Sequence, residues 1–487
     1  MKIYSTFMGI TGAAIASVFL GACSGGGISV GAGTTAGIDG SAVVSRGTIT
    51  GFGSVIVNGV HYDTSKATIK FDDNPGVESD LRIGQVVTIQ GTISDDNPTR
   101  GTADQIVSKS AVEGPISAID TAAGTATVLG QVVHVGADTS FGAGLTLASL
   151  AVNDVIEVSG FARADGSIDA TRIERSSSTT TGEFEVKGIV QNLDTVAQTF
   201  AIGALSINYS TAAIDPELGN LQNGLSVEVK GTLDAGVMQA TSIEPEDDIA
   251  SLVSSAGTRL EIEGIMSNYN ATARSFQMGT TQVVFTTTTR FEDGTQANLA
   301  DNIKVEVEGV LNSNGVFQAD KIEIEPNPSI EIEADVQAID ANAGTLAVLG
   351  ITVHVDPLTT RLEDKSSGAD NSPSTPFSLA SLRVGDRVEI RASLDASGKA
   401  VATRLERDDP DSRVTLQGSV DSVAQPNLTI LGVTVATTSG ATQFRNIDGT
   451  AMTQGDFLSQ AQGKLVKAEG TLNGGTIVAT QVEFEND

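Results

Sequence analysis

The chain contains no tryptophan, one cysteine and three histidines in 487 residues, and aromatic residues make up 4% of it. A single cysteine excludes a disulfide framework, so each folded domain must be held by burial and hydrogen bonding alone. The scarcity of aromatic rings argues against a stacking platform for sugars or bases. Three histidines and one thiol also leave little material for nucleophilic catalysis.

Basic residues are scarce too, because 29 lysines and arginines stand against 60 aspartates and glutamates, for a formal net charge of −31. Nucleic-acid binding depends on neutralising phosphates with basic side chains, so we expect no nucleic-acid partner. The enzyme motifs His-Glu-x-x-His, Cys-x-x-Cys and the phosphate loop are absent, and the letters Gly-x-Ser-x-Gly occur only at 27–31, in the glycine-rich tether and not in a nucleophile elbow. We therefore expect no enzyme, and we identify no catalytic, cofactor-binding or metal-binding residue.

The N-terminus carries a basic residue, Lys2, and then an apolar stretch from about Phe7 to Leu20. This stretch is shorter than the roughly 20 residues of a bilayer span, and small residues follow it, as in a secretory signal. The sequence Leu20-Gly21-Ala22-Cys23 resembles the lipobox of bacterial lipoproteins. The resemblance implies a signal peptide over 1–22, lipidation of Cys23, and attachment of the chain to a membrane of the cell envelope through acyl chains. Ser24 after the cysteine resembles the pattern that directs lipoproteins of enteric bacteria to the outer membrane.

The remainder of the chain is built from six similar units that end alike. Each unit ends in alanine, a polar residue, any residue and an aliphatic residue, with a period of 67 to 83 residues. The six alanines are Ala103, Ala170, Ala240, Ala319, Ala402 and Ala479. Each unit begins with a small residue that is followed two positions later by an apolar one, in the pairs Gly47/Ile49, Gly114/Ile116, Gly188/Val190, Gly264/Met266, Ala334/Val336 and Gly418/Val420.

Two further glycine patterns lie inside the units. Runs such as 303–309 alternate apolar and charged residues, which predicts strands with one buried face, and most of these runs end at a glycine suited to a β-bulge. Those glycines are Gly91, Gly160, Gly231, Gly309 and Gly470, with Ala392 in the fifth unit. A Leu-x-x-Gly/Asn motif precedes the fourth strand in units one to five and predicts a left-handed turn residue at Gly84, Asn153, Gly224, Asn302 and Gly385.

Five or six short strands in about 65 residues predict an all-β fold of six tandem small antiparallel, OB-like β-barrels in a beaded array. The repeat resembles a bacterial domain family of unknown function, number 5666, over about residues 44–485. The resemblance implies an extracytoplasmic module with an OB-like barrel, and it carries no catalytic residue.

The predicted boundaries follow the repeats and the linkers between them. They are 1–22 signal peptide, 23–43 acylated cysteine and flexible tether, 44–109 repeat 1, 110–175 repeat 2, 183–246 repeat 3, 259–325 repeat 4, 329–407 repeat 5 with an inserted loop at 364–377, and 413–485 repeat 6.

Three groups of side chains could carry chemistry, and each has a plainer interpretation. His61, His134 and His354 fall at similar places in three repeats, where we expect solvent-facing strand positions. Acidic clusters at 72–74, 244–248 and 408–411 lack the spacing of calcium loops and are expected to be solvated linker charge. Arg172, Arg175, Arg404 and Arg407 are expected to pair with glutamates on neighbouring strands.

These observations favour a non-catalytic cell-envelope lipoprotein that acts as a spacer or interaction scaffold, with an envelope protein or glycan as a possible partner. The alternative is an extracytoplasmic binding protein for a glycan, a small ligand or a divalent cation. A polar cluster shared by several barrels would favour the binding protein.

Overall fold

The computed structural model describes residues 40–485 except 73, 143, 177–181, 247–248, 254–257, 313–315, 326–327, 370 and 372. The predicted signal peptide, Cys23 and the tether up to residue 39 lie outside the described residues. The first strand begins at Gly40, so residues 40–43, which were predicted to end the tether, belong to the first barrel. Among the described residues there is no helix long and apolar enough to cross a bilayer.

The described chain consists mainly of strands. Repeats 1 to 3 contain β1 (Gly40–Thr48), β2 (Val55–Val57), β3 (Val60–Asp63), β4 (Thr68–Phe71), β5 (Asn74–Gly76), β6 (Val86–Ser94), β7 (Arg100–Ser108), β8 (Val112–Asp120), β9 (Thr125–Val128), β10 (Gln131–Phe141), β11 (Val155–Ala162), β12 (Ile168–Arg175), β13 (Phe184–Ile189), β14 (Gln191–Asp194), β15 (Thr199–Ile202), β16 (Leu205–Asn208), β17 (Ala213–Ile214), β18 (Ser226–Asp234) and β19 (Val237–Pro245).

Repeats 4 to 6 contain β20 (Arg259–Asn270), β21 (Ser275–Met278), β22 (Thr281–Val284), β23 (Arg290–Glu292), β24 (Lys304–Leu311), β25 (Phe317–Ile324), β26 (Ile330–Asp340), β27 (Thr345–Val348), β28 (Ile351–His354), β29 (Arg361–Asp364), β30 (Arg387–Leu394), β31 (Ala400–Asp408), β32 (Arg413–Ala424), β33 (Asn427–Ile430), β34 (Val433–Ala436), β35 (Gln443–Arg445), β36 (Leu465–Asn473) and β37 (Thr476–Phe484). The one α-helix of the described residues, α1 (Gln454–Gln460), precedes β36. Short 3₁₀ helices are η1 (Glu78–Asp80), η2 (Leu147–Ser149), η3 (Pro216–Leu218), η4 (Ile249–Leu252), η5 (Gln296–Asn298) and η6 (Leu379–Ser381).

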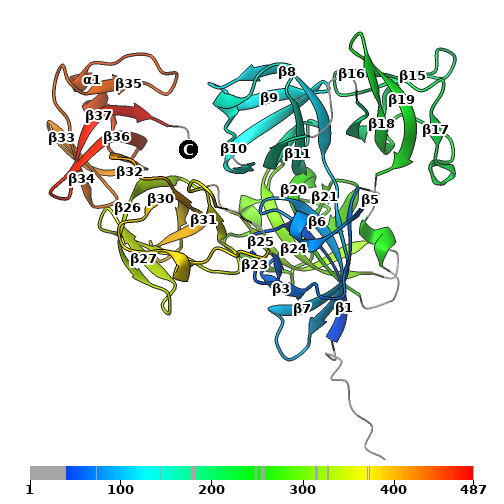
Figure 1. Ribbon diagram of the computed structural model, residues 1–487, viewed down its shortest axis with the longest axis horizontal. Helices are drawn as coiled ribbons and strands as arrows, with labels where there is room; N and C mark the ends of the chain where they lie inside the picture. Colours follow the sequence, from blue (N-terminus) through cyan, green and yellow to red (C-terminus); the bar gives the residue numbers. More distant parts are fainter. Residues whose placement is uncertain are drawn as a thin grey trace, which may run out of the picture. The chain divides into compact units, whose positions relative to one another are not determined.

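Each repeat closes into a small barrel, as the sequence predicted. In repeat 2, β8 pairs with β9, β9 with β10, β10 with β12, β12 with β11, and β11 again with β8 (Figure 1). The third strand and the last strand run parallel, because the long excursion through the fourth strand separates them. This five-stranded barrel order recurs in the other repeats and is the OB-like architecture expected.

Two sequence motifs meet in one backbone clamp. The amide of the left-handed turn residue donates to the carbonyl of the apolar residue that follows the small one, as from Asn153 to Ile116 (2.8 Å) and from Gly385 to Val336 (2.8 Å). The φ angles of these turn residues are positive, 73° at Asn153 and 93° at Gly385. Repeat 6 lacks the leucine of the motif but keeps the clamp, since Gly463 has φ of 73° and donates to Val420. The clamp holds the start of the fourth strand against the middle of the first.

The glycines predicted to form bulges do so. The register shifts immediately before Gly160 and Gly309, as it does before Ala392 in repeat 5. A Cβ atom at Gly309 would lie 2.0 Å from the carbonyl oxygen of Gln318, and one at Gly160 would lie 2.3 Å from that of Asp169. Close approach of two backbones therefore explains these glycines.

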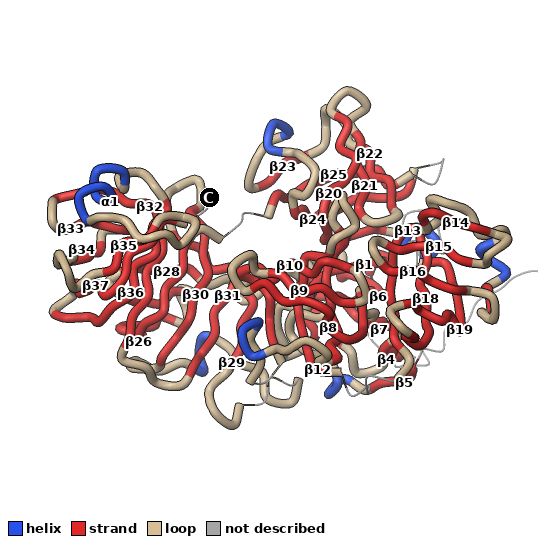
Figure 2. Tube along the Cα trace, turned by 90° about the horizontal axis from the view of Figure 1, so that it is seen from above, coloured by secondary structure: helices blue, strands red, loops and turns tan. Residues whose placement is uncertain are grey.

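The repeats also pair strands with one another, which separate beads on linkers would not do. β1 runs parallel to β20, β8 pairs antiparallel with β13, and β26 pairs antiparallel with β32. In repeats 5 and 6 the resulting sheet runs in the order β31, β30, β26, β32 and β36, and Figure 2 shows strands of both repeats within it. Repeats are thus joined as 1 with 4, 2 with 3, and 5 with 6.

The hydrophobic cores follow the same pairing. One cluster of buried apolar side chains runs through repeats 5 and 6, and another runs through repeats 2 and 3. Val44 of repeat 1 packs into the core of repeat 4. A small cluster of Val86, Phe161 and Ile265 joins repeats 1, 2 and 4. A single repeat taken alone would expose part of this shared core.

We predict that Gly385→Ala destabilises the chain by about 1–2 kcal/mol, because a left-handed backbone is unfavourable for a residue with a Cβ atom. A Cβ atom at Gly385 meets no neighbour within 4 Å, so the effect isolates backbone strain. Gly136→Ala is the matched control, since Gly136 is exposed, equally free of neighbours, and lacks a positive φ. Scanning calorimetry should show a lower melting temperature for the first variant alone. Equal melting temperatures for the two variants would contradict the clamp.

Candidate functional site

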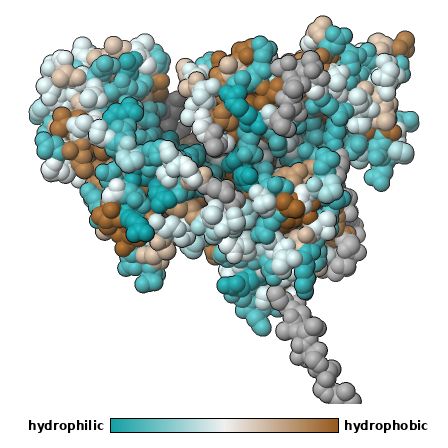
Figure 3. Space-filling model, in the orientation of Figure 1, coloured by the Kyte–Doolittle hydropathy of each residue, from teal (hydrophilic) through white to brown (hydrophobic). Residues whose placement is uncertain are grey.

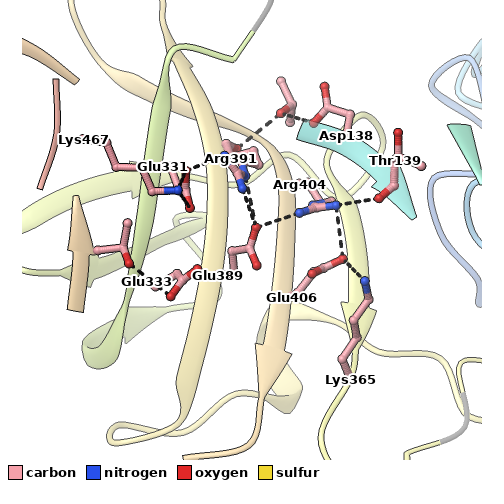
Figure 4. A network of polar contacts seen from close by, with 12 residues as sticks. Asp138, Thr139, Glu331, Glu333, Lys365, Glu389, Arg391, Arg404, Glu406 and Lys467 are labelled. Atoms are coloured by element: carbon pink, nitrogen blue, oxygen red, sulfur yellow. Dashed lines mark hydrogen bonds and ion pairs between the residues drawn. The ribbon is translucent and has the colours of Figure 1, made fainter. Parts of the chain in front are cut away.

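The candidate site is a network of charged side chains where repeats 2, 5 and 6 meet (Figure 4). It arises from the period-two pattern of the strands: Ile332, Ile390 and Leu405 point into barrel cores, and their charged neighbours point outward. In a lone barrel the outward face would be solvated. Here neighbouring strands and a neighbouring repeat cover it.

We call the central row of this network the repeat 5 ion-pair chain. It alternates in sign across four strands and the residue after β29, and consists of Lys467, Glu331, Arg391, Glu389, Arg404, Glu406 and Lys365. Its nitrogen–oxygen distances are 2.9 Å from Lys467 to Glu331, 2.7 Å from Glu331 to Arg391, 3.0 Å from Arg391 to Glu389, 2.8 Å from Glu389 to Arg404, 3.5 Å from Arg404 to Glu406, and 2.7 Å from Glu406 to Lys365.

The same row binds repeat 2. The Nη1 group of Arg404 donates to the carbonyl oxygen of Thr139 (3.0 Å), and the hydroxyl of Thr403 donates to Asp138 (3.1 Å). The guanidinium of Arg361 donates to the carbonyl oxygen of Asp138. These contacts join β31 and β29 of repeat 5 to β10 of repeat 2.

Glu363 extends the network toward repeat 1. Its carboxylate accepts from the hydroxyl of Ser140 (3.0 Å) and lies 3.5 Å from Arg172 of repeat 2. Arg172 in turn donates to the carbonyl oxygen of Ile83 in repeat 1 (2.8 Å). Arg172 and Arg404, which occupy matching positions in their repeats, therefore perform the same task of binding a carbonyl of a different repeat.

The carboxylates of this region are buried to an unusual degree. Glu331, Glu363 and Glu406 are 2%, 1% and 2% exposed. Loss of hydration disfavours the ionised form, but Lys365 and Arg172 outweigh that effect at Glu363 and lower its pKa. At Asp408 burial dominates, assisted by Glu406 and Glu389, and raises the pKa to about 6. Buried charges of this kind are costly unless each has its partner.

Similar junctions join the other repeats. In repeat 3, Lys187 lies 2.9 Å from Glu185 and Lys230 lies 3.3 Å from Glu228. Lys187 also donates to the carbonyl oxygen of Ser110 in repeat 2. Lys109 of repeat 1 also reaches Glu228 (3.3 Å). Between repeats 1 and 4, Glu263 accepts from the hydroxyl of Thr48 (2.9 Å) and pairs with Lys304. The pattern of charged outer faces buried against a neighbour is thus general.

Within the described part of the chain, two groups of three carboxylates are close enough to hold a cation: Glu331, Glu333 and Glu389, and Glu389, Glu406 and Asp408. Calcium prefers several oxygen ligands that are free to turn toward it. Glu389 belongs to both groups and already faces Arg391 and Arg404. Since lysine or arginine also neutralises Glu331 and Glu406, the arrangement is suited to joining repeats more than to binding a metal.

The structure places the three histidines in three different barrels. His134 and His354 are half-buried on β10 and β28, beside the buried residues Val133 and Val353, so they do not face the core. His61 accepts or donates a hydrogen bond with Ser54 (Oγ to Nδ1, 3.0 Å). Burial and the neighbouring Arg100 lower the pKa of His61. No carboxylate among the described residues is hydrogen-bonded to its ring, so the pair lacks the third group of a catalytic triad.

The contacts of the arginines and the exposure of the acidic clusters agree only in part with the predictions from the sequence. Arg404 pairs with Glu389 of the neighbouring strand, as predicted, whereas Arg175 and Arg407 bind the aspartates Asp154 and Asp364. The carbonyl contacts of Arg172 and Arg404 to other repeats were missed.

In the third acidic cluster, Asp409 and Asp411 are exposed and contact Ser367 and Arg413, whereas Asp408 is half-buried and its pKa is raised. In the first cluster, Asp72 accepts from the amide of Ser110, and burial raises its pKa, so it is not solvated linker charge. Asp73, Asp247 and Asp248 lie outside the described residues.

A threonine contact that recurs in four repeats was also missed. The hydroxyls of Thr139, Thr289, Thr360 and Thr442 each donate to the carbonyl of the alanine in the repeat-ending motif, at 2.7 to 2.8 Å. The sequence pattern that could have revealed this contact is a threonine about 30 to 42 residues before each of these alanines. The contact secures the loop after the third strand to the last strand.

Comparison with known proteins agrees with the repeat count. The family described as a domain of unknown function (DUF5666) matches six segments: 43–106, 113–174, 187–244, 263–323, 333–406 and 417–483. No curated protein matches the chain.

We predict that the chain is more stable at mildly acidic pH than at pH 8. Burial raises the pKa of Glu157 and of Glu261 to about 7, against about 4.3 for a free glutamate. Between those values the folded chain binds more protons than the unfolded chain, so these two groups add stability as pH falls from 8 toward 5. Below about pH 5, carboxylates whose pKa is lowered in the folded chain, such as Glu363, become protonated, and the stability that their ionised forms contribute is lost.

Melting temperatures measured from pH 4 to 8 should therefore pass through a maximum near pH 5 to 6. Glu157→Gln with Glu261→Gln should raise the melting temperature at pH 8 by a few degrees and flatten the gain on acidification. Glu217→Gln, at an exposed position, is the control and should leave the profile unchanged. A melting temperature that rises steadily from pH 5 to 8 would rule the prediction out.

Proposed function

Because the chain belongs to the DUF5666 family, whose description assigns no activity, we propose that it is a non-catalytic lipoprotein of the cell envelope that acts as a spacer or interaction scaffold. The observation that carries this proposal is the set of junctions between repeats. Strand pairs and buried ion pairs join barrels that would otherwise be separate, and a joined array keeps its binding surfaces at set distances.

The use of charge supports a scaffold over an enzyme. The lysines, arginines and glutamates of the repeat 5 ion-pair chain, which are buried or half-buried, neutralise one another within repeat 5 and across its junction with repeat 6. A catalytic group needs a free position for substrate, and a metal ligand needs an uncommitted lone pair. The charged side chains of the repeat 5 ion-pair chain are instead paired with one another, and these pairs hold strands and repeats together.

The surface supports a polar partner. Figure 3 shows a face on which hydrophilic and neutral side chains predominate, with apolar ones in small separate groups. The most exposed of the large apolar residues, Val196 and Val384, lie in turns of different repeats. Large apolar patches mark stable protein interfaces, so we favour a polar envelope protein or glycan that contacts several repeats at once.

A divalent-cation binding protein is the second candidate, favoured by the two carboxylate groups around Glu389. The arginines on Glu389 weigh against it. Nucleic acid is not proposed as a partner because of the net charge of −31.

The spacer proposal predicts a narrow distance distribution between repeats 2 and 6. Labels attached at Val132→Cys and Ile447→Cys, both exposed positions, in a Cys23→Ala chain would report this distance by pulsed electron paramagnetic resonance. Flexible linkers of about ten residues would spread it by roughly 15–20 Å, whereas the junctions at Arg404 and at β26 should keep the spread well below that.

Arg404→Gln with Arg361→Gln should broaden the distribution, because both contacts to Asp138 and Thr139 are lost. Arg413→Gln, at a side chain that is 74% exposed, is the matched control. A broad distribution in the chain without these arginine substitutions would mean that the repeats move independently, and the spacer proposal would fail.

The lipoprotein part of the proposal predicts that Cys23 is the anchor. Cys23→Ala should abolish acylation and leave the body in the soluble fraction or the precursor unprocessed, as fractionation and mass spectrometry would reveal. Ser24→Ala is the control and should retain membrane attachment. A cleaved, unacylated chain that stays on the membrane would contradict the assignment.

A further inference from the structure

A cavity of about 250 Å³ lies where repeats 1, 2, 3 and 4 meet. Its wall includes β1 and β6 of repeat 1, the hairpin between β11 and β12 of repeat 2, and the hairpin tips at Gly203 of repeat 3 and Gly279 of repeat 4. The cavity is separate from the repeat 5 ion-pair chain and shares no residue with it. It is somewhat smaller than the pockets that hold drug-sized ligands.

Most charged side chains of the wall are already engaged. Lys109 lies 3.3 Å from Glu228, Lys187 lies 2.9 Å from Glu185, and Arg163 lies 2.8 Å from Asp169. The two acids of the wall also have donors, since Asp165 accepts from the hydroxyl and amide of Ser167 and Glu246 accepts from Ser226. Arg46 is the remaining charged residue of the wall.

Arg46 is half-buried, and its side chain makes no hydrogen bond or ion pair with any described residue. Its backbone is fixed on both sides, because Arg46 pairs with Thr88 of β6 and with Ile262 of β20. Glu263, which follows the β20 partner Ile262 of Arg46, is already bound by Lys304 and Thr48. A guanidinium offers five donors in a planar fork that matches a carboxylate or phosphate, and burying it without an acceptor is unfavourable.

The rest of the wall suits a small molecule with an apolar part. Val86, Ile168 and Ile202 supply apolar surface, and the amides of Gln191 and Asn268 supply polar groups. Because the strands that carry Arg46 are paired on both edges, the site is rigid before any ligand arrives, which lowers the cost of binding.

We propose that this cavity binds a small organic anion, with a carboxylate or phosphate held by Arg46. The bound anion would also tie four repeats together, since their residues line the same space. The proposal goes beyond the scaffold function and does not depend on the membrane anchor.

The test is a titration of the full chain, purified in detergent, with inorganic phosphate and with acetate at constant ionic strength, followed by calorimetry and melting temperature. We expect saturable binding of one anion per chain for at least one probe. Arg46→Gln should weaken it at least tenfold, and Arg413→Gln, at an exposed arginine, should not. An unsaturable response, or an equal response in both variants, would show general screening of a highly charged protein and overturn the proposal.

A second measurement uses the unaltered chain, in case Arg46→Gln does not fold. Arginine-selective modification by phenylglyoxal, read out by mass spectrometry of peptides, should be slowed severalfold at Arg46 by the anion that binds, with no change at Arg413. Equal modification rates at Arg46 with and without each anion would also overturn the proposal.

Discussion

Each barrel leaves the beginning of its first strand without a neighbour on one side, and the rest of the structure depends on how that edge is covered. In repeat 2, β9 pairs only with residues from Ile116 onward, whereas Val112 and Glu113 lie before that point. An open strand edge is a template for pairing with another chain. The first strand of a sister repeat covers the edge here, so the barrels are joined in pairs.

This pairing brings charged faces together. The outward residues of an alternating strand are charged, and pairing first strands buries them, as Glu331 between β30 and β32 illustrates. The scarce basic residues gather at these junctions, where Arg391, Arg404 and Lys467 neutralise carboxylates that would otherwise be isolated. In this strongly acidic chain, many lysine and arginine side chains are therefore paired at the junctions, and the remaining surface is acidic.

Much of the barrel could be predicted from particular residues. Gly309 and Gly385 were recognisable because a close backbone approach and a left-handed turn each exclude most other residues. The same reasoning did not reach Gly463, since the leucine that marks the motif is absent in repeat 6. The candidate site was less accessible, because Arg172 and Arg404 were visible as a matching pair while their carbonyl partners, Ile83 and Thr139, lie 89 and 265 residues away.

The sequence by itself determined the number of repeats, the strand character of each and the positions of its bulges and turns, because these depend on local alternation and on glycine geometry. Only the tertiary structure decided that repeat 1 pairs with 4, 2 with 3, and 5 with 6. Every first strand has the same alternation, so local pattern cannot distinguish one partner from another. The choice depends on which charges and apolar side chains meet when two outer faces come together, and those contacts exist only in the folded chain.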